Sequence, residues 1–280
     1  MPRPITVKEP DLLLIEPRRP LLGVDLAELW RYRELLYFLA WRDVRIRYKQ
    51  TLIGIAWAVL QPIVTVAIFT LLFSRLGGID TGKVAYPLFA FAGLLIWLFT
   101  HAAITFSSSS LINNANLVTK IYFPRIIIPL AATLAAVFDL IFSIALFAVL
   151  MVVYGVAITP QILLAPLFLI IAFILTAAIG VLLSGLTVRF RDVKFTLPFL
   201  LQIWMIASPI FYPVTLVPEK WRLVYALNPL VGLIEGLRSS LFGLPLDWPL
   251  IGTSCGVVLV ICVVAMIVFV RMEDDFADVI

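Results

Sequence analysis

Residues 113–129, with the sequence NNANLVTKIYFPRIIIP, form a polar connector between two long apolar parts of the chain. The connector holds asparagines, a lysine, an arginine and two prolines, whereas no Asp, Glu, Lys or Arg occurs in residues 84–112 before it. Charged residues are strongly disfavoured in the middle of a bilayer. We therefore expect this stretch to make contacts at a membrane surface while its neighbours span the membrane.

The composition excludes a soluble protein. The chain has 280 residues, of which 62% are hydrophobic and 14% charged, whereas soluble domains have roughly a quarter charged residues. A helix needs about 20 apolar residues to cross a bilayer, and the uncharged runs are long enough: Gln50–Ser74, Val84–Thr119, Leu140–Val188, Phe195–Val217 and Trp248–Val270. The formal net charge of +4 comes largely from basic residues beside these runs. That pattern is typical of membrane topology and of contact with anionic lipid, not of nucleic-acid binding.

The N-terminal part contains two predicted regions. Residues 1–24 are rich in proline and mixed charges, which is typical of a tail at the cytoplasmic side. Residues 25–50 interleave apolar and basic side chains, which predicts an amphipathic helix on the membrane surface. The residues that define this interfacial helix are Trp41, Arg42, Arg45, Arg47 and Lys49. An ordinary solvated helix packed on a partner is the alternative.

Residues 51–280 form the predicted membrane domain, with six spans at about Leu52–Phe73, Pro87–Phe106, Ile126–Tyr154, Leu163–Val188, Thr196–Tyr212 and Trp248–Val270. Between spans five and six, residues 216–247 have an uncharged core that is too short for a crossing and is broken by Asn228–Pro229. We expect a re-entrant or interfacial hairpin there. Within it, Glu235 and Arg238 are three residues apart and are expected to pair on one helical face.

Basic residues set the orientation, because they concentrate on the cytoplasmic side. With six spans, one face collects most of them: Arg42, Arg45, Arg47, Lys49, Lys120, Arg125, Arg189, Arg191, Lys194 and Arg271. Both termini and the polar connector are therefore predicted to be cytoplasmic.

Asp139 lies in the middle of the predicted third span. An intramembrane carboxylate costs about 2.5–3.5 kcal/mol on insertion scales, so Asp139 should face protein or water. It is either a functional group or an inter-helix hydrogen-bond partner. The sequence shows no catalytic residue set and no metal-ligand or ATP-binding motif, which argues against an enzyme. A transporter without a motor of its own needs a partner that supplies energy.

Aromatic residues gather toward spans two and five and the hairpin: Trp97, Phe99, Phe106, Trp204, Phe211 and Tyr212. Aromatic residues near the ends of spans commonly form a belt at the membrane interface. The same rings also stack on the apolar faces of sugars. The sequence leaves both interpretations open, an interfacial belt and a glycan-contacting channel.

Several motifs together resemble the permease subunit of type-2 ABC exporters for O-antigen, capsular polysaccharide or teichoic acid. They run in order along nearly the whole chain: Trp41–Lys49 before Leu52–Trp57, Gln61–Pro62, Asn116–Leu117 through Tyr122–Arg125, Arg189–Asp192, Ser208–Pro213 and Asn228–Pro229. None of these motifs is catalytic, so they define the class of protein more firmly than its substrate.

This resemblance implies a homodimer of permeases with two copies of a separate ABC ATPase, which binds the ATP and Mg²⁺, so that this chain holds no cofactor. It implies export of a lipid-linked polysaccharide across the bacterial inner membrane, an interfacial N-terminal helix, and an outer gate formed by the hairpin with Glu235 and Arg238. The loop 113–125 would hold a coupling helix that contacts the ATPase through Asn116, Leu117, Lys120, Ile121, Tyr122, Phe123, Pro124 and Arg125. The alternatives are a membrane enzyme acting on a lipid-linked sugar and an ion-coupled carrier.

Overall fold

Five long helices form the body of the molecule, and each is long and apolar enough to span a membrane. The computed structural model describes residues 26–49, 56–78, 81–82, 84–273 and 276, and no β-strand occurs in these ranges. The five are α3 (Ala56–Phe69) continued by the π-helix η1 (Thr70–Leu76), α4 (Tyr86–Ser108), α7 (Ile127–Val153), the short η2 (Pro160–Leu164) continued by α8 (Ala165–Arg189), and α12 (Trp248–Glu273). The all-α membrane class predicted from composition is confirmed. The predicted tail, residues 1–24, lies outside the described residues.

The predicted fifth span corresponds to α9 (Val193–Ile206), which is shorter than expected. With 14 residues and a rise of about 1.5 Å per residue it is about 21 Å long, less than the ~30 Å hydrocarbon layer. The helix ends just before Ser208–Pro209, and proline cannot continue the hydrogen bonding of a helix. Length and composition therefore identify five spans, and the sixth crossing stays a prediction.

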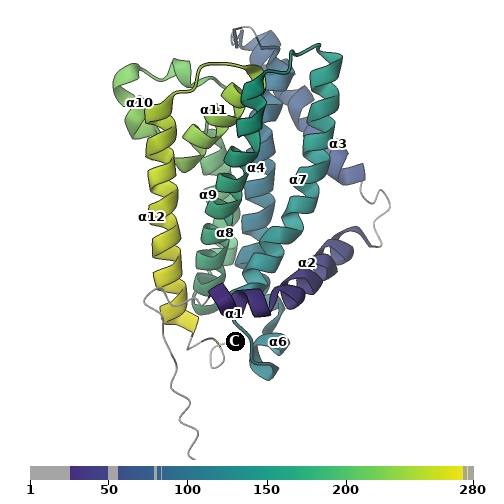
Figure 1. The fold of residues 1–280 in the computed structure, drawn as a ribbon, viewed down its shortest axis with the longest axis vertical. Helices are drawn as coiled ribbons and strands as arrows, with labels where there is room; N and C mark the ends of the chain where they lie inside the picture. The colour runs from purple at the N-terminus through teal and green to yellow at the C-terminus, as the bar shows by residue number, and fades with distance from the viewer. Residues whose placement is uncertain (1–25, 50–55, 79–80, 83, 274–275, 277–280) are drawn as a thin grey trace, which may run out of the picture.

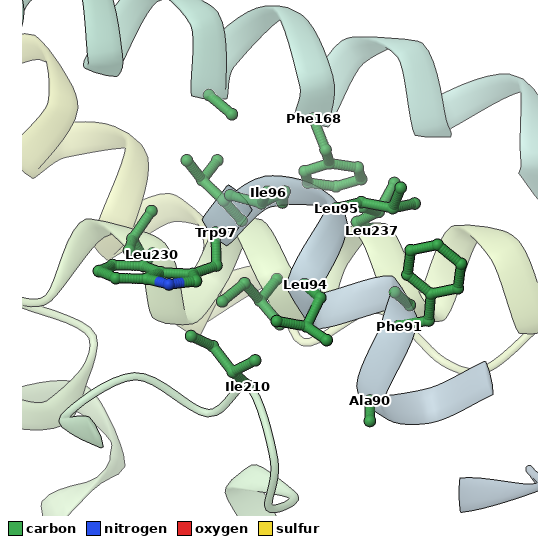
Figure 2. Packing of buried hydrophobic residues seen from close by; sticks show 14 of the residues in the cluster. Ala90, Phe91, Leu94, Leu95, Ile96, Trp97, Phe168, Ile210, Leu230 and Leu237 are labelled. Atoms are coloured by element: carbon green, nitrogen blue, oxygen red, sulfur yellow. The ribbon is translucent and has the colours of Figure 1, made fainter. Parts of the chain in front are cut away.

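Helix α4 is the centre of the bundle. It packs most extensively on α7 and α8, and also contacts α3, α9 and α11 (Pro229–Phe242). Figure 2 shows the result: Phe91, Leu94 and Trp97 of α4 lie among Phe168 of α8 and Leu230 of α11. Because lipid tails are as apolar as these side chains, close packing and not removal from water holds such helices together.

Small and hydroxylated residues let α4, α7 and α8 approach closely. The hydroxyls of Thr100 and Thr176 are 3.3 Å apart between α4 and α8. Ser107 donates to the carbonyl oxygen of Pro129 at 2.7 Å and lies 3.2 Å from the Thr133 hydroxyl on α7. A Cβ atom at Gly180 would lie only 2.6 Å from Ser107 Oγ, so α8 needs glycine at this crossing. Close contact and inter-helix hydrogen bonds are what stabilise helix pairs in a membrane.

One end of the bundle gathers the short helices that surround the polar connector. Figure 1 shows α1 (Leu26–Arg31), α2 (Arg33–Tyr48) and α6 (Ala115–Lys120) at the end where α12 finishes. A second core, here called the connector core, joins these elements; its members include Leu39, Leu111, Val118, Phe123, Ile127, Val188, Phe269 and Phe276. The opposite end carries η3 (Val214–Leu216), α10 (Glu219–Tyr225) and the end of α11, where Gly243 lies against Thr159.

Candidate functional site

The polar connector folds into two short helices followed by a turn. α5 (Ser110–Asn113) and α6 lie between α4 and α7, and α6 ends at Lys120, before Pro124. Ile121 and Tyr122 follow α6 with 56% and 88% of their surface exposed. Phe123 is 5% exposed, because it turns inward into the connector core. The connector therefore presents an aliphatic and an aromatic side chain beside the exposed Lys120 and is anchored from below by Phe123.

Arg125 makes an internal contact at the end of the connector. Its backbone N–H donates to Glu273 Oε1 at 3.1 Å, and its guanidinium Nη1 donates to the backbone carbonyl oxygen of Glu273. Glu273 is the last residue of α12, so the first connector is fastened to the end of the last long helix. Phe276 lies beyond it, 1% exposed, with its ring against Phe269 at a centroid distance of 5.4 Å.

The residues predicted to form the interfacial helix fold as α1 and α2, separated at Tyr32, and their place on the membrane surface stays a prediction. The first and last predicted residues, Asp25 and Gln50, lie outside the described residues. Leu39 and Val44 are buried against the bundle, whereas Phe38 and Trp41 are exposed. Further exposed members of α1 and α2 include Trp30, Tyr37, Arg45 and Ile46. Aromatic and basic side chains together on one exposed surface fit contact with lipid headgroups.

The end of α2 is bonded to the middle of α7. Arg47 Nη1 lies 2.7 Å from Asp139 Oδ2, and the Tyr48 hydroxyl donates to Asp139 Oδ1. The Arg47 guanidinium also lies over the Phe106 ring, 3.9 Å from its centroid. Burial lowers the pKa of Arg47, and the neighbouring Asp139 carboxylate offsets part of this effect. Asp139 is therefore an inter-helix partner, and its bonds hold the interfacial helix against two spans.

The Asn228–Pro229 pair forms the start of α11, with Asn228 as the N-cap and Pro229 as the first helical residue. Its side-chain oxygen accepts from the N–H of Leu230 at 3.1 Å and from Trp204 Nε1 at 2.8 Å. Its amide nitrogen donates to the carbonyl oxygen of Ala207 and to Ser208 Oγ at 3.1 and 3.0 Å. Pro229 occupies the first helical position, where its missing N–H costs nothing. One side chain thus caps α11 and ties it to the end of α9.

Arg238 is the most deeply buried charged residue that the described chain contains, at 1% exposure. Nε donates to the carbonyl oxygen of Phe89 at 3.1 Å, Nη2 donates to that of Ile210 at 2.6 Å, and the guanidinium lies 3.6 Å from the centroid of the Phe89 ring. Nη1 lies 3.6 Å from Glu235 Oε2, so the predicted pairing of these two residues is confirmed. Burial lowers the pKa of Arg238 to about 10, so it stays charged at neutral pH.

The six aromatic residues proposed for glycan contact divide into two groups. Trp97, Phe99 and Phe211 are 3%, 2% and 5% exposed, so they belong to the interior of this chain. Phe211 stacks on Phe69 at a centroid distance of 3.4 Å, and Trp97 packs edge-on against Trp204. The other group keeps accessible surface and comprises Phe106, Trp204 and Tyr212.

Some residues at these sites give no signal in the sequence. Gly93 resembles any other glycine in an apolar helix, yet a Cβ there would lie 2.7 Å from Arg238 Nη2. In the sequence, Glu273 is one of several acidic residues near the end of the chain. In the structure, its carboxylate accepts a hydrogen bond from Arg125, which is 148 positions earlier. Tyr48 lies within the predicted basic helix, and its bond to Asp139 depends on a tertiary contact between residues 91 positions apart.

Comparison with known proteins agrees with this arrangement. The family model for the ABC-2 type transporter matches residues 34–242, about three quarters of the chain. An O-antigen export system permease protein RfbA of Myxococcus xanthus is 28% identical over 255 residues, covering 90% of this chain and 97% of the relative. Two permeases of the same name from Klebsiella pneumoniae are 26% and 25% identical, each covering 88% of this chain and 95% of the relative. The chain is therefore a member of the ABC-2 type transporter family.

Proposed function

We propose that this chain is the membrane-spanning subunit of an ATP-driven exporter that moves a lipid-linked, O-antigen-like polysaccharide across the bacterial inner membrane. Family membership and the names of the relatives support this class of transport. The working unit is a homodimer with two copies of a separate ABC ATPase, which binds ATP and Mg²⁺. Both termini and the connector face the cytoplasm, an orientation that the basic residues at that end support.

The exposed connector is the observation that carries this proposal. Ile121 and Tyr122 project apolar surface from a short loop beside Lys120, at the end where α1, α2 and the last turn of α12 meet. Exposed apolar surface on a charged loop is typical of a protein contact. The ATPase binds these side chains, and Phe123 passes the movement to the connector core that α7, α8 and α12 share.

At the opposite end, residues 216–247 act as the outer gate. Asn228 fastens the gate to α9, and Arg238 fastens it to α4 and to the segment after α9. Since the Arg238 guanidinium donates to the carbonyl oxygens of Phe89 and Ile210 inside the protein, its role in gating is to position α11. Phe106, Trp204 and Tyr212 are the aromatic residues of the predicted set that remain accessible to a glycan.

The test uses Tyr122→Asp with Tyr154→Asp as the matched control. Tyr154 is an exposed tyrosine at the far end of α7 and has 47% of its surface accessible. Each variant is co-expressed with the ABC ATPase, purified, and assayed for complex formation and for polymer export. Tyr122→Asp should lose the complex and export by tenfold or more, because a carboxylate replaces apolar contact surface, while Tyr154→Asp should behave as wild type. Export by the wild-type chain without an ATPase would show that the proposal is wrong.

A further inference from the structure

A cavity of about 240 Å³ lies among α3, α4 and α7 and collects polar side chains from all three helices. The polar members are Gln61 of α3, His101 and Thr105 of α4, and Asp139 and Ser143 of α7. Polar residues in membrane-spanning helices are costly and generally face protein or a water-filled cavity. Their convergence from three otherwise apolar helices marks a polar site at the depth of the membrane.

Gln61 and His101 retain hydrogen-bonding groups that the described chain does not use. Thr105 and Ser143 do not, because their hydroxyls donate to backbone carbonyl oxygens of their own helices, at 2.7 and 3.0 Å. The Gln61 and His101 residues are exposed. Neither the Gln61 amide nor the His101 imidazole forms a hydrogen bond with the described part of the chain, and the imidazole lies 5.9 Å from the Trp97 ring. Polar side chains in membrane spans generally face protein or a water-filled cavity. These groups are therefore available to a polar ligand that enters the cavity.

The charge and shape of the lining select among polar ligands. Asp139 is neutralised by Arg47, so the lining has no net charge that would attract a phosphate or a metal cation. The remaining wall is apolar and includes Phe106, which is 42% exposed. Hydrogen-bonding groups opposite an aromatic ring suit a ligand with hydroxyls on its edge and C–H bonds on its face, which is the chemistry of a neutral sugar.

The cavity also adjoins a second cavity at the connector end of the bundle. This second cavity, of about 360 Å³, is lined by Arg42, Arg47, Asn113 and Asn114. The two cavities share Phe106, whose ring carries the Arg47 guanidinium. A polar route from the connector into the membrane therefore passes the Arg47–Phe106 contact.

We propose that the cavity among α3, α4 and α7 is a binding subsite for a neutral sugar unit of the exported glycan. The Gln61 amide and the His101 imidazole bind its hydroxyl groups, and the Phe106 ring packs against its apolar face. This inference rests on the proposed export function and names the part of the chain that contacts the polymer within the membrane.

The experiment measures access to the cavity and its protection by the glycan. Gln61→Cys and His101→Cys are introduced singly after Cys255 and Cys262, the two cysteines of the chain, have been replaced by serine. Cells that express the ATPase and make the glycan are treated with a water-soluble methanethiosulfonate, in parallel with cells that lack the glycosyltransferase beginning the glycan. Both cysteines should react in cells without glycan, and the reaction should slow at least threefold in cells with it.

Ile141→Cys is the matched control, because Ile141 lies two residues from Asp139 on α7 and is 57% exposed, outside the cavity lining. It should stay unreactive, or react equally, in both strains. If a cysteine at 101 reduces the amount of protein, Thr105→Cys reports on the same cavity. Equal labelling in the cells with glycan and the cells without it would overturn the subsite, and so would a lack of labelling at every cavity position. Export that continues without the ATPase would contradict the proposed function instead. Protection of the cysteines by the glycan would still show that the glycan occupies the cavity.

Discussion

Arg238 shows how one charged residue is accommodated inside an apolar bundle. Two carbonyl oxygens accept from its guanidinium, the Phe89 ring covers one face, and Glu235 lies beside it. Removing a charge from water costs several kcal/mol, and only such a set of partners offsets that cost. The partners come from α4, from α11 and from the segment after α9, so Arg238 holds three elements at one point.

Gly93 makes this arrangement possible, and replacing it tests the arrangement. A Cβ at position 93 would lie 2.7 Å from Arg238 Nη2 and 3.0 Å from the carbonyl oxygen of Ile210. We expect Gly93→Ala to destabilise the chain by about 1–3 kcal/mol, as overpacked cores do. Gly256→Ala is the control, since no atom lies within 4 Å of a Cβ there, and alanine favours a helix by roughly 0.5–1 kcal/mol. Thermal unfolding in detergent measures both variants, and equal midpoints would contradict the steric argument.

At the scale of elements, the sequence predicts helices well wherever long apolar runs determine them. The spans near Ile126–Tyr154 and Trp248–Val270 agree closely with α7 and α12. α9 is the exception, because apolar character continues to Tyr212 while the helix ends at Ile206, before Pro209. Periodicity also could not identify α4 as the central helix, since every span is apolar all round and burial depends on tertiary packing.

The bond between α2 and α7 is the clearest case of an interaction that the sequence cannot predict, because Arg47 and Asp139 are 92 residues apart. Removing one partner leaves a partly buried charge unpaired, so Arg47→Met and Asp139→Leu should each destabilise by about 1–3 kcal/mol. The double variant should cost less than the sum of the two, because no charge then remains unpaired. Thermal unfolding of all four proteins in detergent measures the coupling.

Arg45→Met is the control for this cycle, because Arg45 is exposed on the same helix and lies over the Trp41 ring, 5.4 Å from its centroid. It should change the stability by less than about 0.5 kcal/mol, as most surface substitutions do. Strict additivity of the Arg47 and Asp139 effects would mean that α2 is held to the bundle by other contacts.

At the scale of the whole molecule, the polar connector contacts more elements than the two spans that it joins in sequence. Its predicted contact residues separate into an exposed group, Ile121 and Tyr122, and an inward group that includes Phe123. The sequence predicts contact with the ATPase for all of them, because it does not reveal whether an apolar loop residue points outward or inward. The connector core then joins the connector to α2, α8 and α12 as well as to α7.

Glu273 tests whether α12 takes part in the movement that the proposed exporter needs. Its carboxylate accepts from the backbone N–H of Arg125, so a displaced connector pulls on the last long helix as well as on α7. Glu273→Ala removes this carboxylate bond, keeps the bond from the Arg125 guanidinium to the Glu273 backbone carbonyl, and leaves Ile121 and Tyr122 untouched. We expect the variant to bind the ATPase as wild type does and to export several-fold less polymer per ATP hydrolysed. Arg271→Ala, an exposed change in the same helical turn, should keep the wild-type ratio. An unchanged ratio for Glu273→Ala would show that the carboxylate bond does not carry the movement, since the Arg125 guanidinium bond to the Glu273 backbone carbonyl and the connector core still join the connector to α12.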